Sequence, residues 1–496
     1  MCVLANTRQW LPGLKLLTLC GWLMLAGAAP ASAAETRPNI IVILADDLGW
    51  SDLRCYGADL HETPHLDRLA AAGVRFTDAY AGSSVCTPTR AALMTGRHPA
   101  RLGMTIWAEA AEEPPKPERL IPPPAEHNLP LSETTIAEHL QAAGYQTALV
   151  GKWHLGDPKH YPEAQGFNVN IGGTLWGAPH TFFYPYSGRG MYGKEFRYVP
   201  HLEFGAAGEY LTDRLTDEAL KVIDRCGEQP FFLYLAHHAP HTPIEAKETE
   251  VAAFERQLTP SLHHQNAKYA AMIKSLDESV GRIREHLTKR GLAERTLFVF
   301  TSDNGGFVGK DRGRGAPVTN NWPLRSGKGA LYEGGIRVPL LVSWPGVTPA
   351  GQESHQPVVT MDLFSTMLAA AGCKVPTDVP LDGVSLLPVL KDPRVKLDRE
   401  ALYFHYPHYY HTTSPVSAIR MGDQKLVEFY EDGRAELYNL QDDISESQNL
   451  ASSQPQATAE LKQRLQVWRQ NVGARLPTNN PNFQPRLPKP RGKGGK

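Results

Sequence analysis

The sequence predicts an α/β fold in which a mixed, mostly parallel β-sheet lies between layers of helices. Three observations support this fold class. Short, continuously apolar runs rich in branched and aromatic residues are typical of buried parallel strands. Stretches with helical spacing of apolar residues separate these runs. No repeat of the length found in solenoids or propellers is present. The predicted strands are residues 39–45, 147–150, 231–236 and 297–301.

Helix signals lie between the predicted strands. Thr63 and Pro64 open a helix that ends at Gly73, since proline is favoured in the first helical turn. Ser132 is predicted to cap a second helix that ends at Gly144. Residues 211–226 place apolar side chains at helical spacing, and residues 361–371 are also helix-like.

Composition changes divide the chain into four parts. A proline-rich segment, residues 114–130, is predicted to run over the surface and to contribute no core residues. The Leu381-Asp382-Gly383 turn and Pro393 mark a boundary, beyond which shorter strand-like runs such as 425–430 begin. The final residues lack periodicity and apolar content. We therefore predict a signal peptide (1–34), a large catalytic domain (35–389), a smaller C-terminal α+β subdomain (390–475) and a disordered tail (476–496).

The N-terminal segment has the features of a secretory signal. Arg8 and Lys15 precede an apolar run at residues 16–29, and small residues at 31–34 offer a cleavage site. We expect export to the periplasm or the extracellular space, with no stable membrane span in the mature protein.

Overall charge argues against nucleic acid as a partner. The 496 residues are 42% hydrophobic, and 51 basic against 52 acidic residues give a net charge of −1. A chain without a global positive field has no general attraction to nucleic acid or to anionic membranes. Any anion must therefore be bound by a local arrangement of side chains.

Cysteine is scarce for an exported protein of this size. Beyond the signal segment the chain contains Cys55, Cys86, Cys226 and Cys373, too few for a disulfide framework. If chemistry consumes Cys86, at most one disulfide can form.

Polar side chains follow each of the four predicted strands, where ligands collect in open α/β sheets. Three carboxylates and one amide oxygen suit a hard cation such as calcium, although magnesium is less easily excluded. A single Asp-Asp or Asp-Asn-Gly would more often be a turn or cap, but two such pairs after two buried strands favour a metal site. The residues are Asp46 and Asp47, Lys152 and His154, His237, His238 and His241, and Asp303 and Asn304.

Cys86 stands just before a helix that a proline initiates. Backbone N–H groups at such a helix start favour an anion, and Arg90, one turn further on, adds a fixed positive charge. An isolated cysteine would more often be a buried structural residue. Here the surrounding pattern argues against that interpretation.

These segments closely resemble the sulfatase family. The Cys-x-Pro-x-Arg core at Cys86, Pro88 and Arg90, followed by Thr95-Gly96-Arg97, is similar to the signature at which sulfatases convert cysteine to formylglycine. The likeness runs from residue 37 to about residue 450. One departure is Asn439, where the family usually has aspartate. Further matching motifs are 151–156 (GKWHLG), 239–241 (APH), 302–306 (SDNGG), 328–329 (KG), 333–335 (EGG), 437–440 (LYNL) and 449–450 (NL).

The resemblance implies an alkaline-phosphatase-like fold and assigns a role to each candidate residue. Arg90 and Lys152 would hold a formylglycine hydrate made from Cys86, and His154 would serve as its proton partner. His241 and Lys328 would contact the sulfate ester, and one of them would protonate the leaving alcohol. A formylglycine-generating maturation enzyme is an implied partner. The implied ligands of one Ca²⁺ are Asp46, Asp47, Asp303, Asn304 and residue 86.

The implied mechanism needs an aldehyde hydrate rather than a thiol or serine. One hydroxyl of the hydrate attacks sulfur while the alcohol leaves. His154 then deprotonates the second hydroxyl, which expels sulfate and restores the aldehyde. A serine sulfate ester would have no second hydroxyl with which to eject sulfate.

The predicted substrate is a sulfated carbohydrate. Stretches such as 172–179 resemble bacterial enzymes that desulfate polysaccharides containing galactose or N-acetylgalactosamine. Packing of the aromatic residues against the scaffold is about equally consistent with the sequence as stacking on sugars. Two other functions stay open: a phosphoester or phosphonate monoester hydrolase, and an inactive carbohydrate-binding pseudosulfatase. The aromatic stretch contains Trp176, His180, Phe182, Phe183, Tyr184, Tyr186 and Arg189.

Overall fold

The computed structural model describes residues 37–484 except 114–116, 191–192 and 203. These residues belong to one compact unit. The predicted signal peptide, residues 1–34, and the last part of the predicted tail, residues 485–496, lie outside the described residues.

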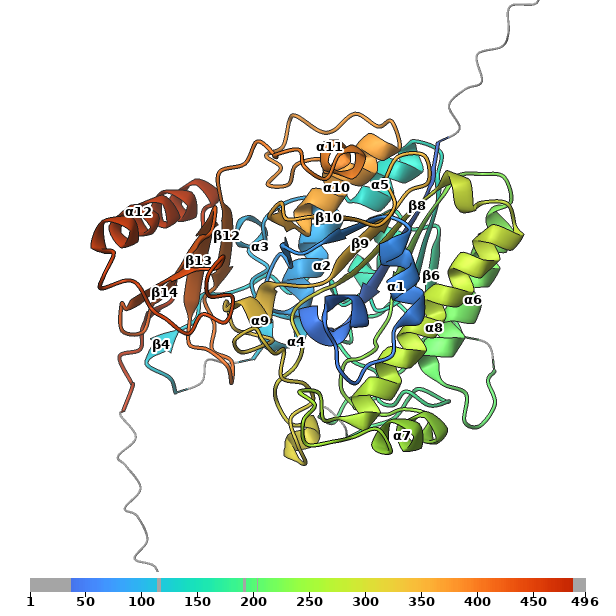
Figure 1. Cartoon of the computed structure of the whole chain (residues 1–496), viewed down its shortest axis with the longest axis horizontal. Coiled ribbons are helices and arrows are strands. Elements are labelled where there is room, and N and C mark those ends of the chain that lie inside the picture. Colours follow the sequence, from blue (N-terminus) through green and yellow to red (C-terminus); the bar gives the residue numbers. More distant parts are fainter. Residues whose placement is uncertain (1–36, 114–116, 191–192, 203, 485–496) are drawn as a thin grey trace, which may run out of the picture. The chain divides into compact units, whose positions relative to one another are not determined.

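A mixed, mostly parallel sheet forms the centre of the protein (Figure 1), as the sequence predicts. Strands β1, β5, β6, β7 and β8 are parallel neighbours, whereas β9 runs antiparallel to both β8 and β2. All four predicted strands are present with ends within one residue of the prediction. The order across the sheet is β10 (Gln352–Ser354), β2 (Val74–Phe76), β9 (Leu340–Ser343), β8 (Thr296–Ser302), β1 (Asn39–Ala45), β7 (Phe231–Ala236), β5 (Gln146–Gly151) and β6 (Val169–Ile171).

Helices cover both faces of this sheet because alternate side chains of its strands point to opposite faces. Ile41 and Ile43 of β1 pack in the same core cluster as α1, α6 and α8. Ile40, Val42 and Leu44 pack with α2, α5 and α10 on the other face. The bounds are α1 (Pro64–Ala71), α6 (Leu211–Cys226), α8 (Ala267–Lys289), α2 (Cys86–Thr95), α5 (Ile136–Ala142) and α10 (Met361–Ala370).

The predicted helix start at Ser132 is wrong by one turn. The Oγ1 of Thr135 accepts a hydrogen bond from the Glu138 N–H at 3.1 Å, and the Glu138 carboxylate accepts one from the Thr135 N–H at 2.7 Å. This reciprocal capping box satisfies two backbone donors that Ser132 would leave open, so α5 begins after Thr135.

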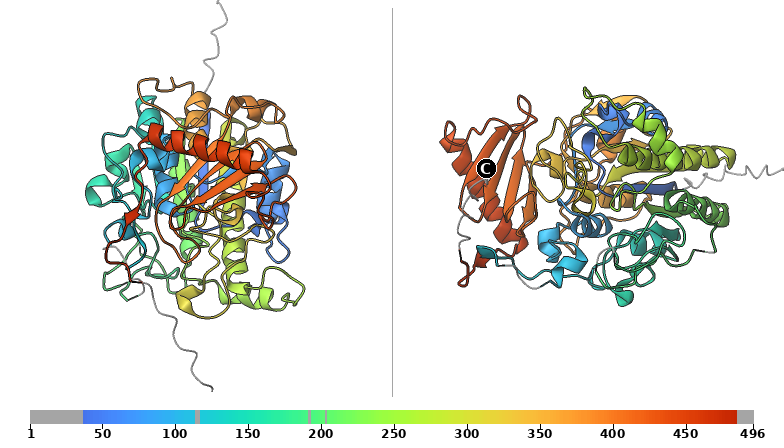
Figure 2. Two further views of the ribbon diagram at one scale, coloured as in Figure 1. Left: turned by 90° about the vertical axis from the view of Figure 1, so that its left-hand side faces the viewer. Right: turned by 90° about the horizontal axis from the view of Figure 1, so that it is seen from below.

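A small antiparallel sheet follows near the C-terminus, with α12 lying across it (Figure 2). Ile419, Leu426 and Leu437 of this sheet pack against Leu461 and Leu465 of the helix. The opposite face packs against residues of the main domain. The predicted division at residues 389 and 390 stays a prediction. The elements are β12 (Leu402–Tyr406), β13 (Val416–Met421), β14 (Gln424–Phe429), β15 (Ala435–Asn439) and α12 (Pro455–Val472).

Short elements correct two predictions from composition. Residues of the predicted disordered tail form β16 (Thr478–Asn479), which pairs with β4 (Leu120–Ile121). Within the proline-rich segment, Leu129 is fully buried and Leu120 nearly so, so this segment does contribute to the core. Both errors arise because pairing between distant segments leaves no mark on local composition.

The remaining elements are β3 (Ala79–Tyr80), β11 (Val358–Val359), α3 (Pro99–Leu102), α4 (Ala108–Ala111), α7 (Glu248–Glu255), α9 (Glu333–Ile336) and α11 (Leu387–Lys391), with 3₁₀ turns at 50–52, 54–56, 158–160, 162–165, 293–295 and 311–313.

No described helix combines the length and the apolar character needed to cross a bilayer. The four cysteines of the described chain, Cys55, Cys86, Cys226 and Cys373, all carry free thiols.

Candidate active site

The polar residues that follow four strands meet at one edge of the central sheet. Strands β8, β1, β7 and β5 are consecutive and parallel, so their carboxyl ends lie side by side. Strand order therefore brings together residues that are up to 258 positions apart in sequence, from Asp46 to Asn304. The residues brought together are Asp46 and Asp47 after β1, Lys152 and His154 after β5, His241 after β7, and Asp303 and Asn304 after β8.

Three buried carboxylates of this edge each contact a cationic side chain. Lys152 Nζ lies 2.7 Å from Asp46 Oδ2, and Lys328 Nζ lies 2.7 Å from Asp47 Oδ1. Arg90 of α2 donates from Nε and Nη2 to Asp303 Oδ2 at 3.0 and 2.8 Å. Helices and loops that are distant in sequence thus supply the positive charges that offset the free-energy cost of burying three carboxylates.

The pKa values of two of these carboxylates are shifted in opposite directions, because burial and nearby charges affect each of them differently. Burial and the neighbouring Asp46 raise the pKa of Asp303 to about 6, although Arg90 opposes this rise. Burial also acts to raise the pKa of Asp47, but Lys328 and His241 outweigh it and lower the pKa to about 2. Asp47 is therefore a firmly ionised group in the site.

Unsatisfied oxygens show that this cluster fits a hard cation. Asp46 Oδ1 and Asn304 Oδ1 are buried and have no hydrogen-bond partner among the described residues. Buried acceptors of this kind normally have a partner, and a bound ion can serve as that partner where the protein supplies none. Asp46, Asp47 and His241 also each present a ligand atom within 4.8 Å of the other two. The oxygen-rich donor set is the type that Ca²⁺ or Mg²⁺ prefers.

Cys86 begins α2 and faces the same region. Val85 before it is extended, so the thiol stands at the N-terminus of the helix, where partial positive charge collects. The side chain is 3% exposed. Burial alone would raise the pKa of the Cys86 thiol, but the nearby charges of Lys152, Lys328 and His154 lower it. This environment stabilises negative charge at residue 86.

His154 is held between Cys86 and an acidic residue that no sequence motif indicated. His154 Nε2 lies 2.6 Å from Glu109 Oε2, and the Nδ1 atom has no hydrogen-bond partner among the described residues. Glu109 Oε1 accepts from the Gly177 N–H at 2.9 Å and lies 3.6 Å from Arg197 Nη2. Burial acts to lower the pKa of His154, but Glu109 and Cys86 outweigh it and raise it.

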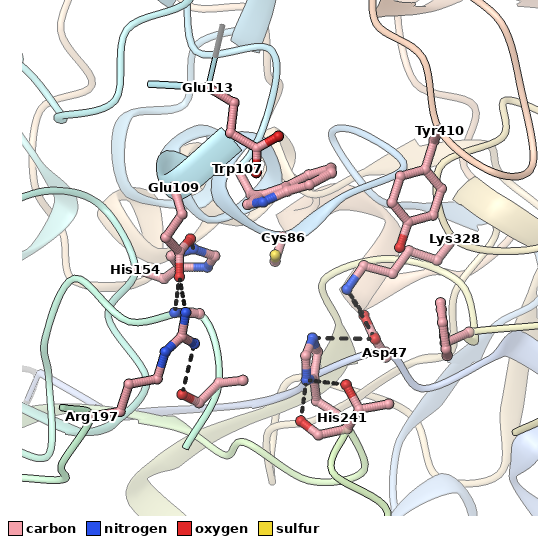
Figure 3. A pocket seen from close by; sticks show the side chains of 14 residues that line it. Asp47, Cys86, Trp107, Glu109, Glu113, His154, Arg197, His241, Lys328 and Tyr410 are labelled. Atoms are coloured by element: carbon pink, nitrogen blue, oxygen red, sulfur yellow. Dashed lines mark hydrogen bonds and ion pairs between the residues drawn. The ribbon is translucent and has the colours of Figure 1, made fainter. Parts of the chain in front are cut away.

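Part of this set lines an open cavity of about 390 Å³, namely Asp47, Cys86, Glu109, His154, His241 and Lys328, whereas Asp46, Arg90, Lys152, Asp303 and Asn304 do not line it. Figure 3 shows the Cys86 sulfur between two groups of side chains: His154 and Glu109 on one side, and Lys328, Asp47 and His241 on the other. The remaining lining residues are Trp107, Glu113, Gly177, Ala178, Arg197, Thr242, Phe307 and Tyr410.

No local pattern in the sequence pointed to Glu109, Trp107, Arg197 or Tyr410. They belong to segments without a strand end or a motif, and only tertiary packing brings them to the cavity. The interpretation of the aromatic stretch as scaffold packing is confirmed for Phe182 and Tyr186, which are 0% and 2% exposed in the core.

His237 and His238 also follow β7 but do not line the cavity. Both are buried, and His237 Nε2 lies 2.9 Å from Ser279 Oγ on α8. Of the three histidines after this strand, His241 alone lines the cavity.

The fold and the site are those of an α/β enzyme. Cys86 stands at a helix N-terminus that stabilises negative charge, and the cavity lies between this residue and a cluster of acidic side chains. A family model described as "Sulfatase" matches residues 38–373, and one described as "N-sulphoglucosamine sulphohydrolase, C-terminal" matches residues 326–471. The chain belongs to the sulfatase family and is a sulfuric ester hydrolase.

Relatives and solved structures agree with this assignment. The N-acetylgalactosamine-6-sulfatase of Homo sapiens is 36% identical over 418 residues, which cover 79% of this chain and 75% of the relative. The crystal structure of Ps i-CgsB in complex with k-i-k-neocarrahexaose is 33% identical, with a TM-score of 0.72 and coverage of 87% of this chain and 92% of that one. The phosphonate monoester hydrolase of Agrobacterium radiobacter shares the fold, with a TM-score of 0.62, 21% identity and coverage of 89% and 97%.

Proposed function

We propose that this sulfatase removes sulfate from sulfated sugars of the galactose or N-acetylgalactosamine type, with residue 86 acting as formylglycine. The position of Cys86 carries the proposal, because its side chain lies in the cavity wall close to Lys152, Lys328 and His154. Support for a sugar substrate comes from the N-acetylgalactosamine-6-sulfatase relative and from the neighbour solved with a neocarrahexaose.

The metal in this proposal is one Ca²⁺ held by Asp46, Asp47, Asp303, Asn304 and residue 86. Two buried oxygens without a hydrogen-bond partner among the described residues, Asp46 Oδ1 and Asn304 Oδ1, support a cation at this place. When bound, the ion would supply positive charge that stabilises the sulfuryl oxygens. It would also compete with Lys152 and Lys328 for their carboxylate partners, which would leave the ammonium groups available to the substrate.

The protein's own residues divide the remaining work. Lys152 and Arg90 would hold residue 86, whose aldehyde hydrate would supply the nucleophile, and a cluster of fixed positive charges would stabilise the developing anion. His154, whose Nε2 lies 2.6 Å from Glu109 Oε2, would accept a proton from residue 86.

His241 and Lys328 lie on the opposite side of the cavity, where a leaving alcohol would stand. Burial lowers the pKa of His241 to about 3, although Asp47 opposes this effect, so the free histidine is neutral at neutral pH. A bound sulfate ester would add a negative charge and favour the protonated imidazole. We assign proton donation to the leaving alcohol to this pair.

The substrate class is tested by comparing turnover of defined esters. Sulfated galactose, N-acetylgalactosamine, glucosamine and fucose saccharides should be compared with the matching phosphate and phosphonate monoesters. The proposal expects the highest kcat/KM on a sulfated galactose or N-acetylgalactosamine. Faster turnover of a phosphorus ester would instead support a phosphoester or phosphonate hydrolase, and no turnover by matured protein would support the pseudosulfatase.

Glu109 gives a prediction about His154. Glu109→Gln keeps the shape but removes the charge that holds the imidazole, so kcat should fall about 10- to 100-fold, less than the roughly 10²- to 10⁴-fold that a positioned acid or base itself contributes. Glu112→Gln is the matched control, because the Glu112 side chain is largely exposed and forms an ion pair with His127 at 3.5 Å. Equal kcat values in the two variants would contradict the role of Glu109.

Maturation and export complete the proposed function. The thiol of Cys86 is nearly inaccessible in the folded chain, so the maturation enzyme would meet this segment before folding. Such timing agrees with the predicted signal peptide, because a secreted chain is unfolded during export. We propose a periplasmic or extracellular site of action.

A further inference from the structure

A second cluster of metal-ligand side chains lies outside the active-site cavity. Asp52, His61 and His264 each present one ligand atom within 4.8 Å of the other two. We call these three residues the Asp52 cluster. All three are buried, with exposed fractions of 0%, 1% and 4%. Asp52 ends a 3₁₀ turn after β1, His61 precedes α1, and His264 precedes α8.

His264 has the arrangement of a histidine prepared to bind a metal. Its Nδ1 lies 2.7 Å from Asp59 Oδ1, which places the ring proton on Nδ1 and leaves the lone pair on Nε2. Nε2 is buried, lies 3.3 Å from Asp52 Oδ1, and has no hydrogen-bond partner of acceptable geometry. Two electron-pair donors that face each other at this distance need a cation between them, either a metal ion or a proton.

His61 supplies the third ligand. Its Nδ1 donates a hydrogen bond to the backbone oxygen of Asp52 at 2.8 Å, so Nε2 is the ring nitrogen that keeps a lone pair for a metal. The rings of His61 and His264 are close, with centroids 4.3 Å apart. Two imidazoles and one carboxylate are the donor set of zinc and related transition metals, whereas calcium and magnesium prefer oxygen alone.

A route from solvent reaches this cluster. His61, His264 and Thr319 line a separate cavity of about 170 Å³, which is large enough for several water molecules. We propose that Asp52, His61 and His264 bind a divalent transition metal ion such as Zn²⁺, with water from this cavity as the fourth ligand.

The position of the cluster gives this metal a structural role. Asp52 Oδ2 accepts hydrogen bonds from the Tyr269 hydroxyl and from the Gly49 N–H, both at 2.7 Å. The Tyr269 hydroxyl also lies 3.0 Å from the backbone oxygen of Asp47. The metal would therefore fix the segment between Asp47 and His61 against the start of α8. This segment directly follows Asp46 and Asp47, the acidic pair of the candidate active site.

The test measures metal binding and not activity, so its outcome is independent of the proposed function. Full-length Cys86→Ala protein is stripped of metal and titrated with Zn²⁺ or Co²⁺ in saturating Ca²⁺. The Ca²⁺ is added to compete with Zn²⁺ for the oxygen-rich site, and the substitution removes the thiol as a ligand. We expect one Zn²⁺ per chain and visible Co²⁺ absorption of four-coordinate type. His241→Ala should retain both signals, since His241 belongs to the other cluster.

Variants of the cluster decide the assignment. In the same background, His264→Ala and His61→Ala should lose the bound ion, and His286→Ala, a matched substitution on the surface of α8, should keep it. Asp59→Asn, which removes the partner of His264, should weaken binding about 10- to 100-fold.

Two results would overturn the proposal: no Zn²⁺ uptake, or uptake unchanged in both His264→Ala and Asp59→Asn. Either would mean that a proton, and not a metal ion, joins Asp52 to His264. If circular dichroism shows that His264→Ala does not fold, the Asp59→Asn titration decides between the two.

Discussion

Cys86→Ala should reduce turnover of sulfate esters to the background rate. In enzymes whose nucleophile and base act as a unit, loss of the nucleophile costs about 10⁶-fold in kcat. Alanine cannot be converted to formylglycine, and the cavity contains no other described cysteine that could replace it. The measurement is kcat on a sulfated saccharide after expression with the maturation enzyme, together with the mass of the peptide that contains residue 86.

The fold of this variant should be unchanged, because the substitution removes a single sulfur atom from the cavity wall. Cys226→Ala is the matched control, since Cys226 is a half-buried free thiol at the end of α6, away from the cavity. It should keep full activity. Near-normal turnover by Cys86→Ala, or an unmodified thiol in fully active wild-type protein, would end the formylglycine proposal.

Removal of Ca²⁺ should abolish turnover and also destabilise the protein. Asp46, Asp47 and Asp303 are buried at one sheet edge, and Asp46 Oδ1 and Asn304 Oδ1 have no hydrogen-bond partner among the described residues. An ion that binds only the folded state, and whose free concentration is 100 times its Kd, stabilises that state by about 2.7 kcal/mol. The free energy of unfolding should therefore rise when Ca²⁺ is added to chelated protein, and kcat should recover in parallel.

Mg²⁺ provides the comparison ion for this experiment. It prefers a stricter octahedral geometry and keeps more of its water, so it should restore less activity than Ca²⁺ at equal concentration. Full turnover by protein shown by elemental analysis to contain no metal would contradict the proposed site. Stronger recovery with Mg²⁺ would contradict the choice of calcium.

The main strands could be predicted because their signal is local. The run at residues 39–45 is buried at every position, and continuous apolar character is what a strand covered on both faces requires. The same signal predicted the candidate site, because Asp46, Asp47, Asp303 and Asn304 directly follow two such runs. The Cys86 motif added the chemistry through residues that are close together in sequence.

Tertiary structure alone decided which distant groups complete the site. Glu109 lies on a short helix without any motif, yet packing places its carboxylate 2.6 Å from His154. His264 and Asp52 are more than two hundred residues apart and meet only because α8 packs behind β1. A local pattern records whether a residue is buried and in which element, whereas the partner of a buried charge depends on how the elements pack. The sequence by itself therefore determined the fold class and the principal chemical groups, and the packed structure determined their partners.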